Sequence, residues 1–433
     1  QLRGQLPELR QEHRVLTIGL FDGISALRVA TDLLGLEVLG HVSVEPDQHA
    51  RRVVESHFPE VRHVSLVQDV DDDMVREWGR VYSQASVVLV GGGPPCQGVS
   101  GLNADRKGAL RDERSKLFVH VQRILGAVRL HFPWCQVHGL MESVSSMDPQ
   151  DRQVMSASFG SQPWKCDAGT MTWCSRPCLY WLTWELTEGT GVRLDRDQEL
   201  GEVILEAHQD LELVCQEGWI KADCSRPFPT FTTSRPRTSP GRKPAGVAQC
   251  TSREIARWQQ DDFRFPPYQY ADRNLLVSKS GEYRLPSIEE KEFMMGFPVG
   301  YTAGCVAKQL RGSQQQQDIR HTLVGNSWSV PVIAWLLSQL FSRLGLCPRY
   351  GPQEVMDLFT PSGLVYMQAR LWRRPLRPLR GPCKDGGGQP LVEKLCNMIS
   401  IKGEDILLTT PSSQLTKYHR LRASVPARLW RWR

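Results

Sequence analysis

The N-terminal third of the chain alternates short apolar runs with segments that carry apolar residues at helical spacing. The apolar runs predict buried strands at 14–20, 37–44, 61–67, 87–90 and 135–141. The segments between them predict helices at 27–34, 48–58, 72–82 and 115–132. Strands that alternate with helices are typical of a doubly wound, mostly parallel α/β sheet. We therefore predict one such sheet in this part of the chain.

The later part of the chain gives fewer regular patterns. A capping box that begins at Ser287 predicts a helix over 287–297. The strongly apolar segment 330–344 predicts a helix that packs on the sheet. The polar segment 186–220 predicts a connector, and the run of glutamines at 314–317 predicts a loop.

Residues that suit ligand binding or catalysis follow the predicted strands at their carboxyl ends. They are Phe21, Asp22 and Gly23 after the first strand, Glu45 after the second, Asp69 after the third, Cys96 after the fourth and Glu142 after the fifth. Right-handed crossovers bring the carboxyl ends of parallel strands to one edge of a sheet, so we expect these side chains at one site. A glycine turn followed about 20 residues later by an acid suits a nucleotide-like ligand, because the carboxylate can accept ribose hydroxyls.

Cys96 is the candidate nucleophile at this edge. A single cysteine on such a loop can attack an electrophilic carbon when its thiolate is stabilised. The same residue can instead be a buried structural thiol, as most free cysteines are. The 12 cysteines of the chain form no Cys-x-x-Cys pair, so neither a metal site nor a disulfide framework is predicted.

Length and composition are typical of a globular protein. The chain has 433 residues, of which 40% are hydrophobic and 23% are charged. No apolar run reaches the roughly 20 residues that cross a bilayer, and no signal peptide is recognisable, so we expect no membrane partner. The chain begins at Gln1 rather than at a methionine, which suggests a piece of a longer protein.

The net charge of +6 is concentrated in two regions. Residues 346–433 hold 15 Lys/Arg against 6 Asp/Glu, which leaves 38 against 41 in the first 345 residues. Within that body, residues 221–274 hold 10 basic and 5 acidic side chains. Basic regions on a near-neutral body predict a polyanionic partner. Tryptophan and leucine alternate with arginine in the tail, which is typical either of a nucleic-acid contact or of a flexible basic extension.

Taken together, the motifs resemble the DNA (cytosine-5) methyltransferases, most closely their eukaryotic de novo branch. The matching stretches follow the family's order over residues 15–345. They are Phe21-Asp22-Gly23, Glu45, Asp69-Val70, Pro94-Pro95-Cys96-Gln97, Asn103–Gly108, Glu142-Ser143-Val144, Ser175–Trp181, Glu292–Pro298 and Gly325–Pro331. The resemblance implies a class I, Rossmann-like methyltransferase fold with a small inserted target-recognition domain.

The resemblance also implies that S-adenosylmethionine is the methyl donor. Its contacts would come from the first glycine turn, the next two strand ends, the turn before Cys96 and the returning Gly-Asn-Ser segment. In this sequence they are Phe21, Asp22, Gly23, Ile24, Glu45, Asp69, Val70, Gly92, Pro94, Asn326, Ser327 and Trp328. The family pattern places Glu45 on the ribose and Asp69 on the adenine amine.

The same resemblance implies the reaction. The Cys96 thiolate would add to C6 of cytosine, Glu142 would hydrogen-bond N3, and Arg176 would complete the catalytic set. The activated C5 would then accept the methyl group. Because C5 lies inside a duplex, the base would have to flip out into the pocket.

Contacts to double-stranded DNA are expected from two segments. The loop 98–114 would close over the flipped base, and the segment 221–280 would read the target. The residues are Asn103, Arg106, Lys107, Arg235, Arg237, Arg242 and Lys243.

The chain is expected to divide into four parts. They are an N-terminal extension (1–14), a catalytic core in two pieces (15–220 and 281–345), a target-recognition domain (221–280) and a basic C-terminal extension or linker (346–433).

Three residues depart from the family pattern. Ser143 replaces the asparagine after the catalytic glutamate, and Ser25 replaces a second glycine of the first turn. Cys178 replaces the second arginine of an Arg-x-Arg motif, which would bind the O2 atom of cytosine. Losing that charge-assisted hydrogen bond predicts catalysis weaker by roughly 10-fold to 100-fold.

The sequence thus predicts a nuclear DNA (cytosine-5)-methyltransferase, alone or as a homo- or hetero-oligomer. Two alternatives stay open. One is a tRNA cytosine-5 methyltransferase of the same fold, and the other is a catalytically inactive DNA-binding or regulatory paralogue, which Cys178 and Ser143 favour.

Overall fold

The computed structural model describes residues 14–359, except 102, 104–105, 197–199, 209–214 and, within 232–273, every residue other than 252, 256 and 259. The chain before residue 14 and beyond residue 359 therefore lies outside the described residues, as does most of the predicted recognition segment. Within the part that the structure describes, none of the helices combines the length and the apolar character that a membrane crossing requires.

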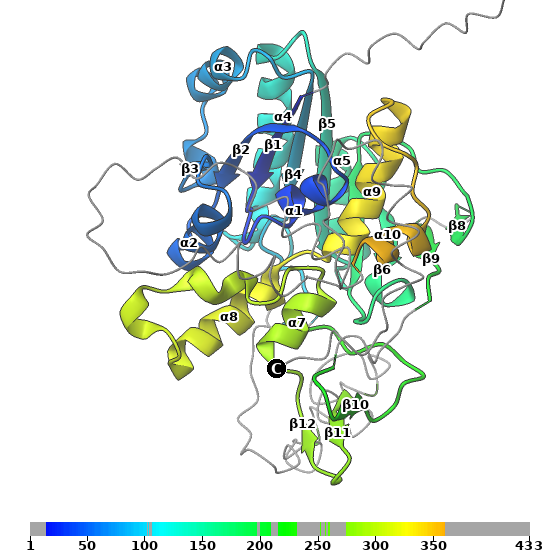
Figure 1. Cartoon of the computed structure of the whole chain (residues 1–433). Helices are drawn as coiled ribbons and strands as arrows, with labels where there is room; N and C mark the ends of the chain where they lie inside the picture. Colours follow the sequence, from blue (N-terminus) through cyan, green and yellow to red (C-terminus); the bar gives the residue numbers. More distant parts are fainter. Residues whose placement is uncertain are drawn as a thin grey trace, which may run out of the picture. The chain divides into compact units, whose positions relative to one another are not determined.

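One large sheet holds the N-terminal half of the chain together (Figure 1). From one edge, its first five strands lie in the order β3-β2-β1-β4-β5, and all five run parallel. They are β1 (Val15–Leu20), β2 (Val38–Val44), β3 (Arg62–Val64), β4 (Val87–Gly92) and β5 (Gln136–Val144). Every residue of β1 and β4 is buried, as expected of strands covered on both faces. The strand order reverses at β1, so the predicted doubly wound, Rossmann-like fold is confirmed.

The other edge of the sheet is mixed. β7 (Pro177–Leu182) runs antiparallel to β5 and to β6 (Trp164–Asp167). β9 (Gly201–Leu205) and β8 (Val192–Asp195) extend the sheet beyond β6. The prediction of a plain connector over 186–220 was wrong in this respect, because the two strands have only four and five residues and their longest apolar run is the three residues 203–205.

Helices cover both faces of the sheet, as the alternating pattern requires (Figure 1). On one face lie α3 (Asp72–Val81), α4 (Val119–His131) and α5 (Pro149–Phe159), whose buried residues share one core with the strands. On the other face α1 (Ala26–Leu33) packs against α9 (Val330–Arg343), which confirms the apolar helix predicted there.

Two adjacent glycines of β4 mark the two faces. A Cβ atom on Gly91 would meet Leu27 of α1, whereas a Cβ atom on Gly92 would meet Val121 of α4. Successive residues of β4 therefore face opposite sides of the sheet up to its last residue.

The later chain returns to the sheet through a helical segment. It comprises α7 (Ile288–Met294), η8 (Tyr301–Cys305) and α8 (Gln314–Asn326) before α9, and α10 (Pro352–Leu358) after it. η8 packs against α2 (Gln48–His57) of the N-terminal half. The capping box predicted at Ser287 is present.

The glutamine run at 314–317 is the first turn of α8 rather than the predicted loop. The prediction was wrong because Ser313 caps the helix: its hydroxyl accepts a hydrogen bond from the Gln316 N–H at 3.1 Å. The composition of this run is typical of a loop, but the Ser313 cap stabilises it as the first turn of a helix.

A small antiparallel sheet borders the predicted recognition segment. It consists of β10 (Trp219–Lys221), β11 (Leu276–Ser278) and β12 (Tyr283–Arg284), paired in this order. The chain on either side of residues 232–273 thus runs through the neighbouring strands β10 and β11, which is a suitable base for an inserted domain.

Candidate active site

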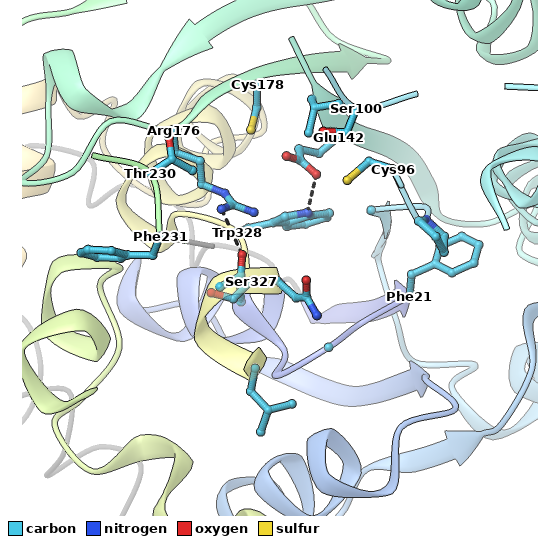
Figure 2. Close-up of a pocket in the computed structure, with 18 of the residues that line it drawn as sticks. Phe21, Cys96, Ser100, Glu142, Arg176, Cys178, Thr230, Phe231, Ser327 and Trp328 are labelled. Carbon is cyan, nitrogen blue, oxygen red and sulfur yellow. Dashed lines mark hydrogen bonds between the residues drawn. The ribbon is translucent and has the colours of Figure 1, made fainter. Parts of the chain in front are cut away.

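The carboxyl ends of the central strands open into one cavity (Figure 2). Its volume is about 1240 Å³. The predicted site residues that line it are Phe21, Asp22, Gly23, Ile24, Glu45, Pro94, Cys96, Asn103, Glu142, Arg176, Asn326, Ser327 and Trp328. Single small-molecule sites measure roughly 300–1,000 Å³, so this cavity has room for two ligands side by side.

The first turn forms one wall of the cavity and has an uncommon backbone. Phe21, Gly23 and Ser25 have positive φ angles of 53°, 54° and 61°. A Cβ atom on Gly23 would meet nothing within 4 Å, so open space lies over this residue. Glu45 holds the turn, because its Oε2 atom accepts a hydrogen bond from the Gly23 N–H at 2.9 Å. Open space beside a firmly held backbone suits a bound nucleoside.

Glu45 is held through both oxygens. Its Oε1 atom accepts a hydrogen bond from the Asp47 N–H at 2.9 Å, and the residue is buried. Burial raises the pKa of Glu45, although these two backbone hydrogen bonds act in the opposite direction. Each oxygen keeps a further lone pair, so the carboxylate can also accept ribose hydroxyls.

Asp22 supports the first turn from inside the protein. Its Oδ2 atom lies 3.0 Å from Nε2 of His41 and accepts the Ser25 hydroxyl. Thr17 lies 2.9 Å from the other ring nitrogen of His41. Burial opposes ionisation of Asp22, but its contacts with His41 and Ser25 outweigh that effect and lower its pKa. Ser25, which replaces a family glycine, thus uses a left-handed backbone to place its hydroxyl on Asp22.

Three predicted cofactor residues do not line the cavity. Asp69 ends the short helix η1 (Val67–Asp69) and its side chain is exposed. Val70 is fully buried, and its carbonyl accepts a hydrogen bond from Arg123 of α4 at 2.6 Å. Gly92 faces the α4 side of the sheet. The adenine contact of Asp69 therefore stays a prediction.

The opposite wall carries the predicted nucleophile. Cys96 follows the Gly93-Pro94-Pro95 turn that ends β4, and its side chain points into the cavity (Figure 2). Burial and the nearby Glu142 carboxylate raise the pKa of the Cys96 thiol to about 11, and Arg176 offsets only part of this. The thiol is therefore protonated at neutral pH, so its reaction requires the proton to leave as the sulfur attacks.

We expect Cys96 to react slowly with iodoacetamide at neutral pH, and about tenfold faster for each pH unit of increase, because only the thiolate attacks. Mass spectrometry of the Cys96 peptide across a pH series measures the slope. Cys224 is exposed and serves as the reference thiol in the same digest. A Cys96 rate that is already independent of pH near neutrality would contradict this expectation.

Arg176 reaches into the cavity from the residue before β7 (Figure 2). Its Nη1 atom donates to the Gly325 carbonyl at 3.3 Å, and its Nε atom is buried with no hydrogen-bond partner among the described residues. Cys178 is buried on β7, where burial and the Glu142 charge raise the pKa of its thiol well above the ordinary range. A neutral thiol thus stands where the family pattern has a cation, and Arg176 supplies positive charge beside Glu142.

The C-terminal end of α8 closes the cavity. Asn326 is exposed there, and the Ser327 hydroxyl donates to the Val324 carbonyl at 2.8 Å. Trp328 extends into the cavity, where its Nε1 atom donates to Oε2 of Glu142 at 3.1 Å (Figure 2). The structure therefore brings this segment, distant in sequence, to the ends of β4 and β5.

Sequence reasoning missed the residues that join the two halves of the site. Tyr301 of η8 is buried, and its hydroxyl donates to the Ile24 carbonyl of the first turn at 2.9 Å. Its ring stacks on His57 of α2 with 4.0 Å between centroids. Beside η8, Glu292 and Arg320 form a buried ion pair at 3.0 Å. Glu292 interrupts the apolar stripe of α7, which is the signal that could have found it.

The predicted DNA contacts lie in different settings. Arg106 pairs with Asp148 at 2.8 Å, so that the loop 98–114 docks on the start of α5. Asn103 lines the cavity, and Lys107 is exposed. Arg235, Arg237, Arg242 and Lys243 lie outside the described residues.

A family model and two curated relatives each match about a quarter of the chain. Residues 15–132 match the family model of the C-5 cytosine-specific DNA methylases. DNA (cytosine-5)-methyltransferase DRM2 of Oryza sativa subsp. japonica is 28% identical over 117 residues, and DRM1 of Arabidopsis thaliana is 31% identical over 118 residues. Each match covers 26% of this chain and 19% of the relative, so the aligned part spans about a fifth of these curated relatives.

The chain is also similar to solved structures of methyltransferases. A mutant of Spodoptera frugiperda DNMT2 has a TM-score of 0.43 and 20% identity, covering 76% of this chain and 99% of that one. The Entamoeba histolytica methyltransferase EhMeth has a TM-score of 0.45 and 16% identity, covering 77% and 99%. The family match and the two curated relatives confirm the resemblance that the motifs predict: through residues 15–132 the chain is similar to the DNA (cytosine-5) methyltransferases.

Proposed function

We propose that the protein transfers a methyl group from S-adenosylmethionine to C5 of cytosine in double-stranded DNA. The observation that supports this best is the convergence of Cys96, Glu142 and Arg176 with the first turn and Glu45 on one cavity. A thiol, a carboxyl and a guanidinium around a space beside a nucleoside-type turn suit few reactions other than this one. The family match over residues 15–132 supports the same class of reaction.

The residues present fit the proposed methyl donor. Gly23 faces open space, and Glu45 can accept ribose hydroxyls. Glu45, Asp47 and Glu142 give the cavity acidic side chains, which favour a cationic ligand. Phe21 and Asn326 would complete the contacts. When bound, S-adenosylmethionine supplies an electrophilic methyl group.

Each catalytic side chain has a distinct task in this proposal. Cys96 gives its proton to solvent as its sulfur bonds to C6 of cytosine, so electron density builds up at C5 and N3. Glu142 hydrogen-bonds N3 and stabilises that charge, and the Arg176 guanidinium stabilises charge on the pyrimidine carbonyl. Transfer of the methyl group would leave S-adenosylhomocysteine, and loss of the C5 proton to solvent with departure of the Cys96 sulfur would then restore the aromatic ring.

Charges at the rim of the cavity support a nucleic-acid substrate. Arg114 and Arg226 line the cavity and are exposed. Lys107 and Arg111 are exposed on the same loop as Arg114. Phosphates on either side of a flipped nucleotide would lie at such a rim, where cations bind them. Nuclear localisation and the reading of DNA by residues 221–280 are part of this proposal.

Labelled methyl transfer to duplex DNA and to tRNA, with Cys96→Ala as the control, tests the proposal. We expect label in DNA, and label found only in tRNA would replace the proposed substrate with RNA. A protein that binds the donor and DNA yet forms no covalent adduct with 5-fluorocytosine DNA would instead be the inactive paralogue. Cys178 is the observation that favours this second candidate.

A further inference from the structure

Trp328 occupies a place that a simple cofactor contact does not explain. Figure 2 shows its indole among the side chains of Cys96, Glu142 and Arg176, all of which line the cavity. The ring touches the catalytic side of the cavity through one polar atom, Nε1, which donates to Oε2 of Glu142 at 3.1 Å. The residue predicted to bind the methyl donor is therefore hydrogen-bonded to the predicted acid.

The glycines at the end of β4 form a slot for this indole. A Cβ atom on Gly93 would lie 2.6 Å from Nε1 of Trp328, and a Cβ atom on Gly91 would lie 3.3 Å from Cη2. Neither glycine has a positive φ angle, so a special backbone conformation does not explain them. Their missing side chains leave the space that the indole fills.

The backbone on both sides of Trp328 is fixed. Ser327 ends α8 and donates its hydroxyl to the Val324 carbonyl. Val330 begins α9, and its N–H donates to the Met295 carbonyl at 3.0 Å. The indole is therefore presented from two helix ends, not from a free loop.

We propose that Trp328 is a positioning residue for Glu142, and this rests on the proposed function. An indole N–H only donates, so Oε2 of Glu142 accepts, and Oε1 is the oxygen that remains to hydrogen-bond the base. The indole thereby fixes the rotation of the carboxyl and selects the oxygen that hydrogen-bonds N3 of the base. Correct orientation of an acid contributes to rate rather than to ground-state binding of the donor.

Trp328→Phe keeps a ring in the slot and removes the donor. We expect unchanged affinity for S-adenosylhomocysteine and a rate of adduct formation on 5-fluorocytosine DNA lower by roughly 10-fold to 100-fold. In a Glu142→Ala background, which removes the acceptor, the same change should cause no further loss, because its effect passes through Glu142. Gly93→Ala should reproduce the lower rate by displacing the indole. Weaker donor binding with a normal adduct rate at saturating donor would overturn the proposal.

Trp184→Phe is the matched control. Trp184 is also buried, and its Nε1 atom has no hydrogen-bond partner among the described residues, so the same substitution removes no donated bond. We expect this variant to form the adduct at the parent rate. If Trp184→Phe lowered the rate of adduct formation as much as Trp328→Phe does, the loss would come from the smaller ring and not from the missing hydrogen bond. That result would also overturn the proposal.

A measurement without catalysis separates this proposal from the proposed function. The indole ¹⁵N–¹H resonance of Trp328, assigned by its absence in Trp328→Phe, should shift in Glu142→Gln, because an amide is a weaker acceptor than a carboxylate. The Trp184 resonance should stay in place. If the parent forms no adduct but the resonance shifts, the proposed function fails and the contact stands. If the adduct forms and the resonance does not shift, the Trp328 proposal fails alone.

Discussion

Replacing Cys96 with alanine is expected to lower single-turnover methyl transfer by at least ~10⁴-fold, because the sulfur forms the bond that activates C5. The fold should survive, since the hydrogen bonds that hold this turn use the Cys96 carbonyl and not its side chain. Labelled methyl incorporation into duplex DNA with enzyme in excess measures the rate. Electrophoretic trapping on 5-fluorocytosine DNA reports the covalent adduct directly.

Cys135→Ala is the control for this experiment. Cys135 lies just before β5, and its thiol donates to the Ala85 carbonyl, away from the cavity residues. This variant should keep the parent rate and the adduct. If Cys96→Ala kept about a tenth of the parent rate, the covalent mechanism would be ruled out, because methylation of C5 without the bond from sulfur to C6 could not reach that rate.

Glu292→Ala is expected to lower the free energy of unfolding by about 3–5 kcal/mol, because it removes one partner of a buried ion pair. Glu292 is fully buried and accepts hydrogen bonds from the N–H groups of Gly300 at 2.6 Å and Thr302 at 2.9 Å. Arg320 donates to the same carboxylate at 3.0 Å. The alanine would leave these donors without their acceptor in a site that water does not reach.

Glu289→Ala provides the matched control for Glu292→Ala. Glu289 pairs with the same Arg320 at 2.6 Å, but its side chain is 33% exposed. Removal of this outer partner should cost no more than about 1 kcal/mol, because water replaces it. Urea denaturation of both variants gives the two values. If both variants lost the same free energy of unfolding, the loss would come from the unpaired charge of Arg320 and not from the burial of Glu292.

The ends of the parallel strands could be predicted as the site because topology alone places them. Once β1, β2, β4 and β5 are recognised, Phe21, Glu45, Cys96 and Glu142 must share an edge, whatever their side chains contact. The third strand shows the limit of this reasoning. β3 ends at Val64 and η1 follows it, so Asp69 comes five residues after the strand and does not line the cavity, and its contact with adenine stays a prediction.

Contacts between distant side chains could not be predicted in the same way. Trp328 and Glu142 are 186 positions apart, and their hydrogen bond depends on the space that Gly91 and Gly93 leave open. No local pattern reports that space. The family resemblance placed Trp328 near the cofactor but gave no sign of its bond to the acid. Packing at atomic detail, not periodicity, determines this part of the site.

The Tyr301 hydroxyl on the Ile24 carbonyl has a consequence for how the protein matures during synthesis. The two residues are 277 positions apart, so the turn proposed to hold the methyl donor gains this support only after η8 has left the ribosome. The parallel strands can pair earlier, since their partners lie close in sequence. A nascent chain that stops before residue 301 could therefore pair its parallel strands, but its donor site would lack the hydrogen bond from Tyr301.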